Sequence, residues 1–256
     1  MRVLLLTVAG LSSRFSESVG YSCLKCIYHR QSVRESLLYR MLDRHELFDR
    51  IVIVGGFRFH ELEEFVNREF AGIMYKLLLV ENGHFADYGS GYSFQAGVRA
   101  LEQDMGGAVC DELVFAEGDL FVDDESFRAV CMSDKSVMTY TAKPIYADKS
   151  VAFYLDMNGR PHYIYDTAHG SLRIDEPFKA VFNSGQVWKF SRPEVLRGIL
   201  DGLGEEELQG TNLVPVNAYF QSIESGEVLL LGFRKWVNCN TVQDFNEMIN
   251  GEEYGG

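Results

Sequence analysis

The amino-acid sequence predicts an α/β fold, with helices packed on a mostly parallel sheet and a smaller β-rich part later in the chain. Short apolar runs alternate with segments of helical periodicity from the first residues onward, which is the pattern of parallel strands and crossover helices. Shorter, partly alternating runs follow in the second half. A length of 256 residues allows one large core, and no internal repeat or linker divides it. We therefore expect a single domain.

The first part of the chain is predicted to form a βαβαβ unit. Ser32 and Glu35 have the spacing of a Ser-x-x-Glu capping box, which marks the start of an amphipathic helix that carries Leu38 and Leu42. The predicted strands cover residues 3–8, 51–54 and 77–80, and the predicted helices cover residues 32–48 and 59–70.

The sheet is predicted to continue beyond this unit. A helix over residues 92–102 leads to the apolar run 113–116, which we interpret as another buried strand. After Asp124 the pattern changes, and Asn158-Gly159 offers a tight turn for a hairpin. The other predicted elements are strands over 137–142, 151–156, 162–166 and 228–231, a loop or helix end at 204–207, an intervening region over 213–223, and a closing helix capped by Thr241 and Asp244 behind a loop of Asn238, Cys239 and Asn240.

Charge and apolar content exclude several classes of protein. With 24 Lys and Arg against 37 Asp and Glu, the chain carries a formal net charge of −13, which repels nucleic-acid phosphates and anionic lipid. No apolar run approaches the ~20 residues that span a bilayer, so we expect a soluble protein, and residues 1–11 are interpreted as a buried strand rather than a signal peptide. Five scattered cysteines predict free thiols and a cytoplasmic location.

The turn after the first predicted strand combines small residues with a cation. The segment Ala9-Gly10-Leu11-Ser12-Ser13-Arg14 lets the backbone approach a phosphate, so that successive N–H groups can point at its oxygens. Arg14 adds a delocalised positive charge. Lys25 follows in the segment that precedes the predicted helix at Ser32. We therefore expect two cations to flank one phosphate-binding pocket.

These residues resemble the signature of the nucleotidyltransferase (nucleotide-diphospho-sugar transferase-like) superfamily. The signature is Ala-Gly-x-Gly-Ser/Thr-Arg, a variable gap, and Pro-Lys. Here it reads Ala9-Gly10-Leu11-Ser12-Ser13-Arg14 and Leu24-Lys25. Ser12 stands at a glycine position of the family and Leu24 at its proline position, whereas both cations are retained.

Four further stretches resemble the family in the same order along the chain. Glu81-Asn82-Gly83-His84-Phe85 through Ser93-Phe94 is similar to the segment that lines the base pocket of cytidylyltransferases for phosphocholine and related compounds. Glu117-Gly118-Asp119 resembles the family's Gly-Asp, whose aspartate holds Mg²⁺ at the carboxyl end of a strand. Asn183-Ser184-Gly185, with Lys179 nearby, is similar to an Asn-x-Gly that precedes a strand beside the acceptor site. Residues 236–245 resemble the closing Asp/Asn-Thr-Pro-x-Asp-Leu, with Asn240 at the second metal position.

The resemblance implies a three-layer αβα sandwich with a mixed, mostly parallel, Rossmann-like sheet and a small β-rich acceptor-binding insert. It implies a nucleotide-binding half (1–124), an acceptor-binding half (125–235) and a closing metal loop and helix (236–256). The implied reaction transfers a nucleoside monophosphate, with CTP favoured, to a phospho-alcohol or phosphonate and releases pyrophosphate. The implied roles are catalysis for Arg14 and Lys25, nucleotide binding for Ala9, Gly10, Leu11, Ser12, Ser13, Asn82, Ser93, Glu117 and Gly118, acceptor binding for Lys179 and Asn183, and Mg²⁺ binding for Asp119 and Asn240.

Several alternatives stay open at this point. A sugar 1-phosphate with UTP or dTTP is the nearest alternative pair of substrates. The serine, leucine and asparagine that replace family residues also allow a nucleotide-binding domain without catalysis. Cys23, Cys26 and His29 have part of the spacing of a zinc knuckle, but no second Cys/His pair follows. A hydrolase would need Gly-x-Ser-x-Gly, and a glycosyltransferase would need Asp-x-Asp. The base, the acceptor and the oligomeric state are not determined.

Overall fold

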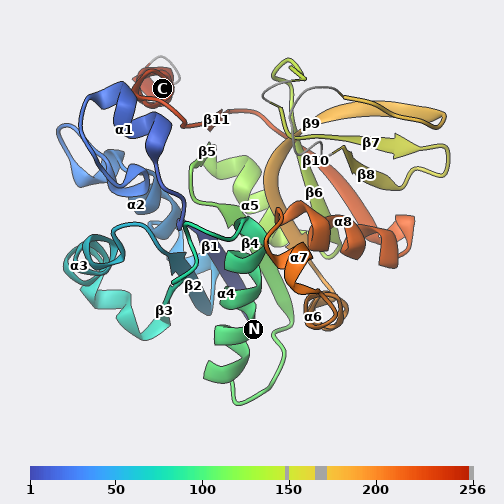
Figure 1. Cartoon of the computed structure of the whole chain (residues 1–256), viewed down its shortest axis with the longest axis horizontal. Helices are drawn as coiled ribbons and strands as arrows, with labels where there is room; N and C mark the ends of the chain where they lie inside the picture. The colour runs from blue at the N-terminus through green and yellow to red at the C-terminus, as the bar shows by residue number, and fades with distance from the viewer. Residues whose placement is uncertain (148–149, 165–171, 254–256) are drawn as a thin grey trace.

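The centre of the molecule is a sheet of nine strands (Figure 1). The computed structural model describes residues 1–147, 150–164 and 172–253. The strands of this sheet are β1 (Arg2–Thr7), β2 (Arg50–Gly55), β3 (Leu77–Glu81), β4 (Glu112–Glu117), β6 (Ser136–Thr141), β7 (Ala152–Asp156), β8 (Pro161–Ile164), β9 (Phe178–Phe190) and β10 (Val228–Phe233).

Most strands of this sheet run in the same direction. The main path is β10-β6-β9-β4-β1-β2-β3, and a hairpin of β7 and β8 continues from β9. The pairs β1–β2, β1–β4, β2–β3 and β6–β10 are parallel, whereas β9 is antiparallel to both β4 and β6. On the main path β9 is therefore the reversed strand. The predicted mixed, mostly parallel sheet is confirmed, and so is the β-rich extension.

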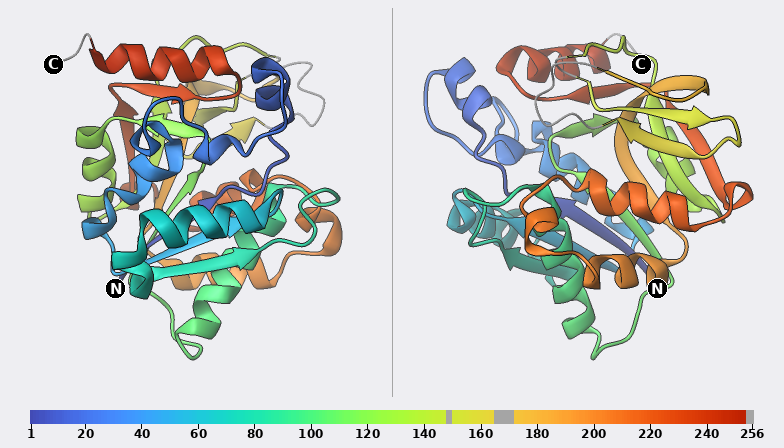
Figure 2. Two further views of the ribbon diagram at one scale, coloured as in Figure 1. Left: turned by 90° about the vertical axis from the view of Figure 1, so that its left-hand side faces the viewer. Right: turned by 45° about the vertical axis from the view of Figure 1, so that its right-hand side comes forward.

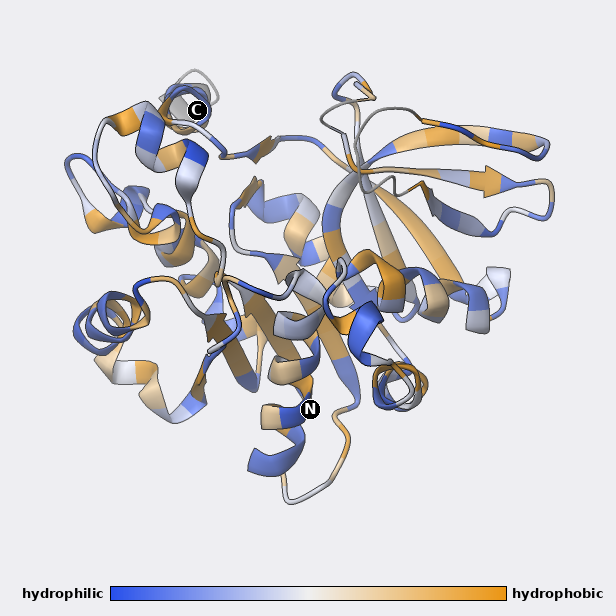
Figure 3. Cartoon of the chain, in the orientation of Figure 1, coloured by the Kyte–Doolittle hydropathy of each residue, from blue (hydrophilic) through white to orange (hydrophobic). Residues whose placement is uncertain are grey.

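The two faces of the sheet bury separate apolar clusters, because side chains alternate along each strand. In β1, Leu4 and Leu6 point to one face, while Val3 and Leu5 point to the other. Figures 2 and 3 show helices on both sides of hydrophobic strands, which confirms the three-layer αβα arrangement. The first face packs against α2 (Leu37–Leu42), α3 (Phe59–Glu69) and α5 (Asp124–Met132), and the second against α4 (Ser90–Asp104), α6 (Pro193–Asp201) and α8 (Leu213–Ser222).

A third, smaller cluster joins the two ends of the chain. Helix α1 (Ser13–Val19) lies against α9 (Val242–Glu253), and Phe15 is buried with Phe245. A two-stranded antiparallel sheet of β5 (Leu120–Val122) and β11 (Trp236–Asn238) runs beside this cluster. The remaining short elements are α7 (Glu205–Leu208), which contacts α4, and the 3₁₀ turns η1 (Lys25–Ile27), η4 (Ala71–Lys76) and η5 (Ser225–Glu227).

The prediction of one helix over residues 32–48 is wrong. Ser32 caps only the 3₁₀ turn η2 (Val33–Glu35), and the Glu35 carboxylate accepts hydrogen bonds from backbone N–H groups of the preceding turn. Ser36 is extended, with ψ 145°, and its hydroxyl accepts a hydrogen bond from the first turn of α2, so the helix starts behind a second cap. A further turn, η3 (His45–Leu47), completes the segment.

Sequence reasoning missed β9 because a polar stretch in its middle has the composition of a turn. Asn183-Ser184-Gly185 was expected to precede a strand, but it lies inside this 13-residue strand. The register against β6 shifts at this point, and Gln186 has φ 54°, which is the signature of a bulge. Helices α1, α5 and α6 were also missed. In α1 only Phe15 is buried, so the helix has no apolar periodicity to recognise.

The hairpin and the closing helix agree with the prediction. Gly159 has φ 83° in the turn between β7 and β8, and the Asp156 carboxylate accepts hydrogen bonds from the backbone of Asn158 and Arg160. Residues 165–166, the end of the strand predicted over 162–166, lie outside the described residues. The Asp244 carboxylate accepts from the Thr241 backbone N–H, and the Thr241 hydroxyl accepts from that of Asp244. None of the helices in the described ranges is both long and apolar enough to cross a membrane.

Candidate functional site

The candidate site lies where β1 and β4 end side by side. These strands are parallel, and Thr7 pairs with Glu117 at their carboxyl ends. The turn that follows β1 and the turn that follows β4 therefore start next to each other, in the crevice where open α/β sheets bind ligands. Gly118 fits only as glycine, because an added Cβ would lie 2.1 Å from the Val8 side chain and 3.0 Å from the Thr7 carbonyl oxygen.

The turn after β1 is held by a serine in a conformation that favours glycine. Ser12 has φ 56° and ψ 23°, the left-handed region, which costs an L-residue roughly 1–2 kcal/mol. Its hydroxyl accepts a hydrogen bond of 3.2 Å from the backbone N–H of Lys25. Ser12 therefore keeps a glycine-like turn and also ties it to the segment that carries Lys25.

Lys25 and Asp119 form the central ion pair of the site. The Lys25 Nζ lies 2.9 Å from Asp119 Oδ2, and the two side chains are 17% and 23% exposed. The other carboxylate oxygen, Asp119 Oδ1, is buried and has no hydrogen-bond partner. A buried, unpaired carboxylate oxygen is costly, so this atom is poised to accept a ligand.

Glu117 lies beside this pair and is half-buried. Burial, and then the charge of Asp119, raise the pKa of Glu117 to about 7. The Asn212 side-chain amide donates a hydrogen bond of 2.9 Å to Glu117 Oε1 and opposes part of this shift in pKa. Burial and the neighbouring carboxylate therefore favour the protonated form of Glu117 more than water does.

Two cavities open on this group of residues. One holds about 230 Å³, and within it the Asn82 amide donates a hydrogen bond of 2.9 Å to the Ser93 hydroxyl. The other holds about 80 Å³ and shares Thr7, Gly10 and Asp119 with the first. The larger cavity is lined by Thr7, Ala9, Gly10, Asn82, Phe85, Tyr88, Gly89, Ser90, Ser93, Glu117 and Asp119, and the smaller by Thr7, Val8, Gly10, Ser12, Leu24, Lys25, Cys26, Gly118 and Asp119.

The loop before α9, near the C-terminal end of the chain, also reaches the site. The backbone N–H of Cys239 donates a hydrogen bond of 2.8 Å to the Asp119 carbonyl oxygen. Arg14 donates a hydrogen bond of 2.9 Å to Asn240 Oδ1, and the Asn240 amide donates to Asn238. Arg14 and Asn240, which are 226 positions apart in the sequence, are thus in contact, but the Asn240 side-chain oxygen is occupied by a cation.

The donor set fits one Mg²⁺ ion that keeps water and substrate oxygens in its shell. Asp119 offers the unpaired Oδ1, and Mg²⁺ is commonly bound through one or two carboxylates together with substrate phosphates. Within the described residues, no group of three or more His, Cys, Asp and Glu side chains could hold a metal by itself. The cysteines Cys23 and Cys26 are buried free thiols, so the structure gives no support to a zinc knuckle.

The structure does not bring the two predicted acceptor residues into this group. Lys179 is exposed near the outer end of β9, whereas Val187 of the same strand pairs with Ala116 beside the site. Lys179 thus lies on the other side of the bulge at Gln186 from Val187. The Asn183 amide donates hydrogen bonds to the carbonyl oxygens of Lys143 and Pro144 and so fixes the loop after β6.

Sequence reasoning missed the segment, residues 209–212, that holds one wall of the larger cavity in place. The backbone carbonyls of Gln209 and Gly210 accept hydrogen bonds from Gly89 and Gly91 at the start of α4. Asn212 is buried, its backbone N–H donates to the Ser90 hydroxyl, and its side chain reaches Glu117. Residues 209–212 carry no motif, and their position before a helix would have predicted only a cap.

Comparison with known proteins identifies one matching family. The model of the family described as "Domain of unknown function (DUF6564)" matches residues 21–252. None of the curated proteins matches the chain significantly.

Solved structures with the same fold include three nucleotidyltransferases. The inositol-1-phosphate CTP transferase from T. maritima is 16% identical, with 98% of this chain and 94% of that chain covered and a TM-score of 0.69. The CTP:phosphocholine cytidylyltransferase from Streptococcus pneumoniae is 16% identical, with coverages of 98% and 100% and a TM-score of 0.61. A putative glucose-1-phosphate thymidylyltransferase from Bacillus anthracis is 14% identical, with coverages of 100% and 98% and a TM-score of 0.66. The fold implied by the sequence resemblance is confirmed.

Proposed function

The chain belongs to the family described as "Domain of unknown function (DUF6564)", and we propose that it is a nucleotidyltransferase. In this proposal it transfers a nucleoside monophosphate from a nucleoside triphosphate to a phosphorylated small molecule and releases pyrophosphate. The observation that carries the proposal is the Lys25–Asp119 pair, with its unpaired carboxylate oxygen, beside the Ser12 turn and the two cavities. The shared fold of known nucleotidyltransferases supports it.

The two cavities divide the donor nucleotide between them in this proposal. The cavity with Asn82 and Ser93 takes the base and ribose, because it is the larger one and offers side-chain amide and hydroxyl groups. The cavity with Ser12 and Lys25 takes the phosphates, which meet the backbone of the β1 turn and a lysine. CTP is favoured, since two of the structures that share the fold are of enzymes that use CTP.

The two cation–oxygen contacts of the site would open together when a triphosphate binds. Lys25 would leave Asp119 and Arg14 would leave Asn240, because each cation has a stronger attraction to phosphate oxygens. Asp119 Oδ2 and Asn240 Oδ1 would then be free of their cations, and the two side chains would hold Mg²⁺. When bound, Mg²⁺ neutralises charge on the phosphate oxygens.

The chain's own residues would supply position and positive charge rather than covalent chemistry. An acceptor phosphate oxygen attacks the α-phosphorus in line, the bond from that phosphorus to the β-phosphate oxygen breaks, and pyrophosphate departs. Lys25 and Arg14 stabilise the negative charge that grows on the α-phosphate oxygens and on pyrophosphate. No general base is needed, because an acceptor phosphate is already ionised near neutral pH.

We further propose that the division of labour within the single domain follows the sequence halves, with residues 1–124 binding the nucleotide, 125–235 binding the acceptor and 236–256 closing the metal site. The favoured acceptor is a phospho-alcohol or phosphonate. Asn183 supports this assignment as the residue that fixes the loop after β6. Lys179, which is exposed near the outer end of β9, stays a proposed acceptor contact. The five free, buried cysteines support a cytoplasmic location.

Two alternatives have an observation in their favour. A uridylyl- or thymidylyltransferase for sugar 1-phosphates is supported by the thymidylyltransferase fold at a TM-score of 0.66. A nucleotide-binding domain without catalysis is supported by Asn240, whose oxygen is already engaged by Arg14.

A pyrophosphate-release assay separates these alternatives. The four nucleoside triphosphates are each combined with phosphorylated alcohols, phosphonates and sugar 1-phosphates, with and without Mg²⁺. Release with CTP and a phospho-alcohol or phosphonate is the expected result. Release only with UTP or dTTP and a sugar 1-phosphate would favour the uridylyl- or thymidylyltransferase instead. Saturable triphosphate binding without pyrophosphate release from any pair would contradict catalysis and favour the nucleotide-binding domain.

A further inference from the structure

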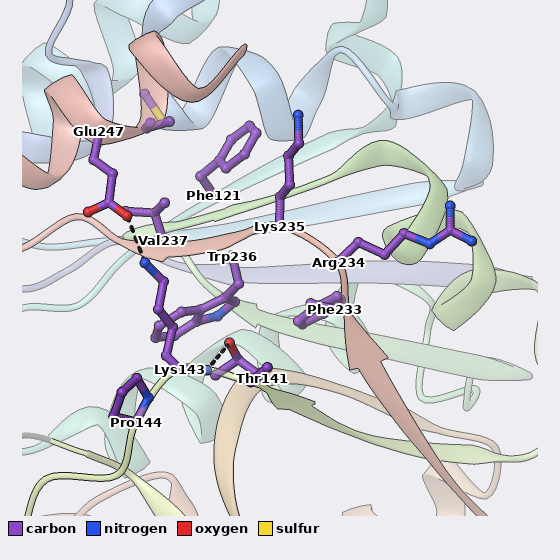
Figure 4. Close-up of a pocket in the computed structure, with 12 residues that line it drawn as sticks. Phe121, Thr141, Lys143, Pro144, Phe233, Arg234, Lys235, Trp236, Val237 and Glu247 are labelled. Carbon is purple, nitrogen blue, oxygen red and sulfur yellow. Dashed lines mark hydrogen bonds and ion pairs between the residues drawn. The ribbon is translucent and has the colours of Figure 1, made fainter. Parts of the chain in front are cut away.

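A third cavity of about 430 Å³ lies against the small sheet of β5 and β11, between the end of β6, the end of β10 and the middle of α9 (Figure 4). Its volume is in the range of sites that bind small molecules, and its lining combines aromatic walls with a few charged groups, which is typical of such sites. It shares no lining residue with the two cavities of the candidate active site.

The apolar wall of this cavity is held in a fixed geometry. The Trp236 indole N–H donates a hydrogen bond of 2.9 Å to the carbonyl oxygen of Gly185, at the bulge in β9. Gly185 must be small here, because an added Cβ would lie 2.6 Å from the Phe233 ring. Phe121 pairs in register with Val237 across the small sheet. Trp236 and Phe233 thus both lie against the bulge, and together with Phe121 they line an apolar surface.

The rim of the cavity is basic in a chain that is strongly acidic overall. Three basic side chains and one acidic side chain line it, against a formal net charge of −13 for the whole chain. Arg234 is paired with Glu125, which lies outside the cavity, and Lys143 is paired with Glu247 across the opening at 2.7 Å. The fourth charged group of the rim is Lys235.

The Lys143–Glu247 pair is the contact that an incoming anion would replace. The two side chains are 47% and 57% exposed, so water already screens their attraction, and such surface pairs contribute little to stability. Figure 4 shows this pair on one side of the cavity and the ring of Trp236 below it. A negatively charged group that entered beside Trp236 would be within reach of the Lys143 ammonium and would lose little free energy in displacing Glu247.

We propose that this cavity is a second ligand site, separate from the nucleotide site, which binds an organic anion with an apolar body. The apolar body packs on Trp236, Phe121 and Phe233, and the phosphate or carboxylate pairs with Lys143 in place of Glu247. The site goes beyond the proposed transfer reaction and does not depend on it. Its wall is part of the same small sheet that follows Asp119 and precedes Asn240, so a bound ligand would contact the element that positions both.

Phenyl phosphate is a direct probe of this site, and tryptophan fluorescence is the readout. The chain has two tryptophans, of which Trp188 is fully buried in the core and Trp236 lines the cavity. Phenyl phosphate should quench the wild-type fluorescence saturably, and the Trp236→Phe variant should lose the saturable change. Phenol and inorganic phosphate, titrated separately, should each bind at least about tenfold more weakly, because each provides only half of the contacts.

Charge variants of the rim test whether Lys143 binds the anion in place of Glu247. Lys143→Ala should weaken phenyl phosphate binding about tenfold, and Lys135→Ala, which removes an exposed lysine elsewhere, should leave it unchanged. Glu247→Gln should tighten binding by up to about fivefold, because it frees Lys143. Calorimetric titration of the same variants gives affinities that do not depend on fluorescence.

Three outcomes would overturn the proposal. Equal binding of phenol would show an apolar groove without anion selectivity, and equal loss in Lys143→Ala and Lys135→Ala would show non-specific attraction. Loss of binding in Lys25→Ala, with Lys143→Ala unaffected, would place the probe in the nucleotide site. Because the measurement is binding without turnover, a failure of the proposed reaction leaves this test valid.

Discussion

The two cation–oxygen contacts over the site differ in burial and in charge. Lys25 and Asp119 are both mostly buried and form an ion pair, and Asp119 Oδ1 has no hydrogen-bond partner. Arg14 and Asn240 meet at the surface, and Asn240 is neutral. Because Lys25 and Asp119 are only 17% and 23% exposed, water screens their charges less than it screens the charge of Arg14 at the surface. We therefore expect changes to the first contact to have larger effects.

Asp119→Ala should have the largest effect, because it removes the carboxylate whose Oδ1 is buried and has no hydrogen-bond partner. Mg²⁺-dependent pyrophosphate release should fall by about 10³-fold or more, since the metal's charge stabilisation amounts to several kcal/mol. Steady-state assays across a Mg²⁺ titration measure this loss. Asp134→Ala, an exposed aspartate in a turn, is the matched control. Full activity of the wild type in a chelator would contradict the assignment.

Lys25→Ala should be next, with turnover at least ~10²-fold lower, because it removes a cation aimed at transition-state charge. The apolar core around it is unchanged, so the variant should stay folded, but the melting temperature should fall because Asp119 loses its ion-pair partner. Single-turnover rates measured beside thermal melts check both statements, with Lys135→Ala as the lysine control. Turnover near the wild-type rate would remove Lys25 from the site.

Substitutions of Asn240, in the more exposed contact, should have smaller effects on the Mg²⁺ dependence. Asn240→Asp places a carboxylate where Arg14 now contacts an amide, so the Mg²⁺ concentration for half-maximal rate should fall several-fold, and Asn240→Leu should raise it. If the residue serves only in the turn before α9, both variants should keep the wild-type Mg²⁺ dependence and act on stability alone, by about 1 kcal/mol through the neighbouring Thr241 cap. A Mg²⁺ titration beside melting curves distinguishes the two results.

Glu117 should give the smallest effect, seen in stability rather than in rate. Its pKa is raised from 4.5 to about 7 in the folded chain, mainly by burial and then by Asp119. The folded state therefore holds this proton more tightly than the unfolded state, and stability falls as pH rises from about 4.5 to about 7. Glu117→Gln should remove that part of the pH dependence. Denaturant melts of both proteins at several pH values measure it, and parallel pH curves would contradict the shift in pKa.

Much of the fold was determined by local pattern. The runs that became β1, β2 and β4 are buried on both faces, and β3 is partly buried on both, so all four are apolar at nearly every position and are recognisable without an alignment. Where an element buries only one side, or where polar residues interrupt it, the hydrophobic pattern did not predict it. Helix α1 buries only Phe15, and β9 carries a polar bulge in its middle, so neither has a period to read.

The motifs in the sequence indicated which residues could meet a phosphate and a metal. Arg14 and Asp119 stand in the turns after predicted strands, and Lys25 stands in the segment before the predicted helix at Ser32. Only the tertiary structure decided what each one contacts. The contacts of the site join residues that are not neighbours in the chain. They are the hydrogen bonds from Lys25 to Ser12, from Arg14 to Asn240 and from Asn212 to Glu117, and the ion pair of Lys25 with Asp119. Such pairs leave no local signal, because their spacing is fixed by strand order and packing and not by neighbours in sequence.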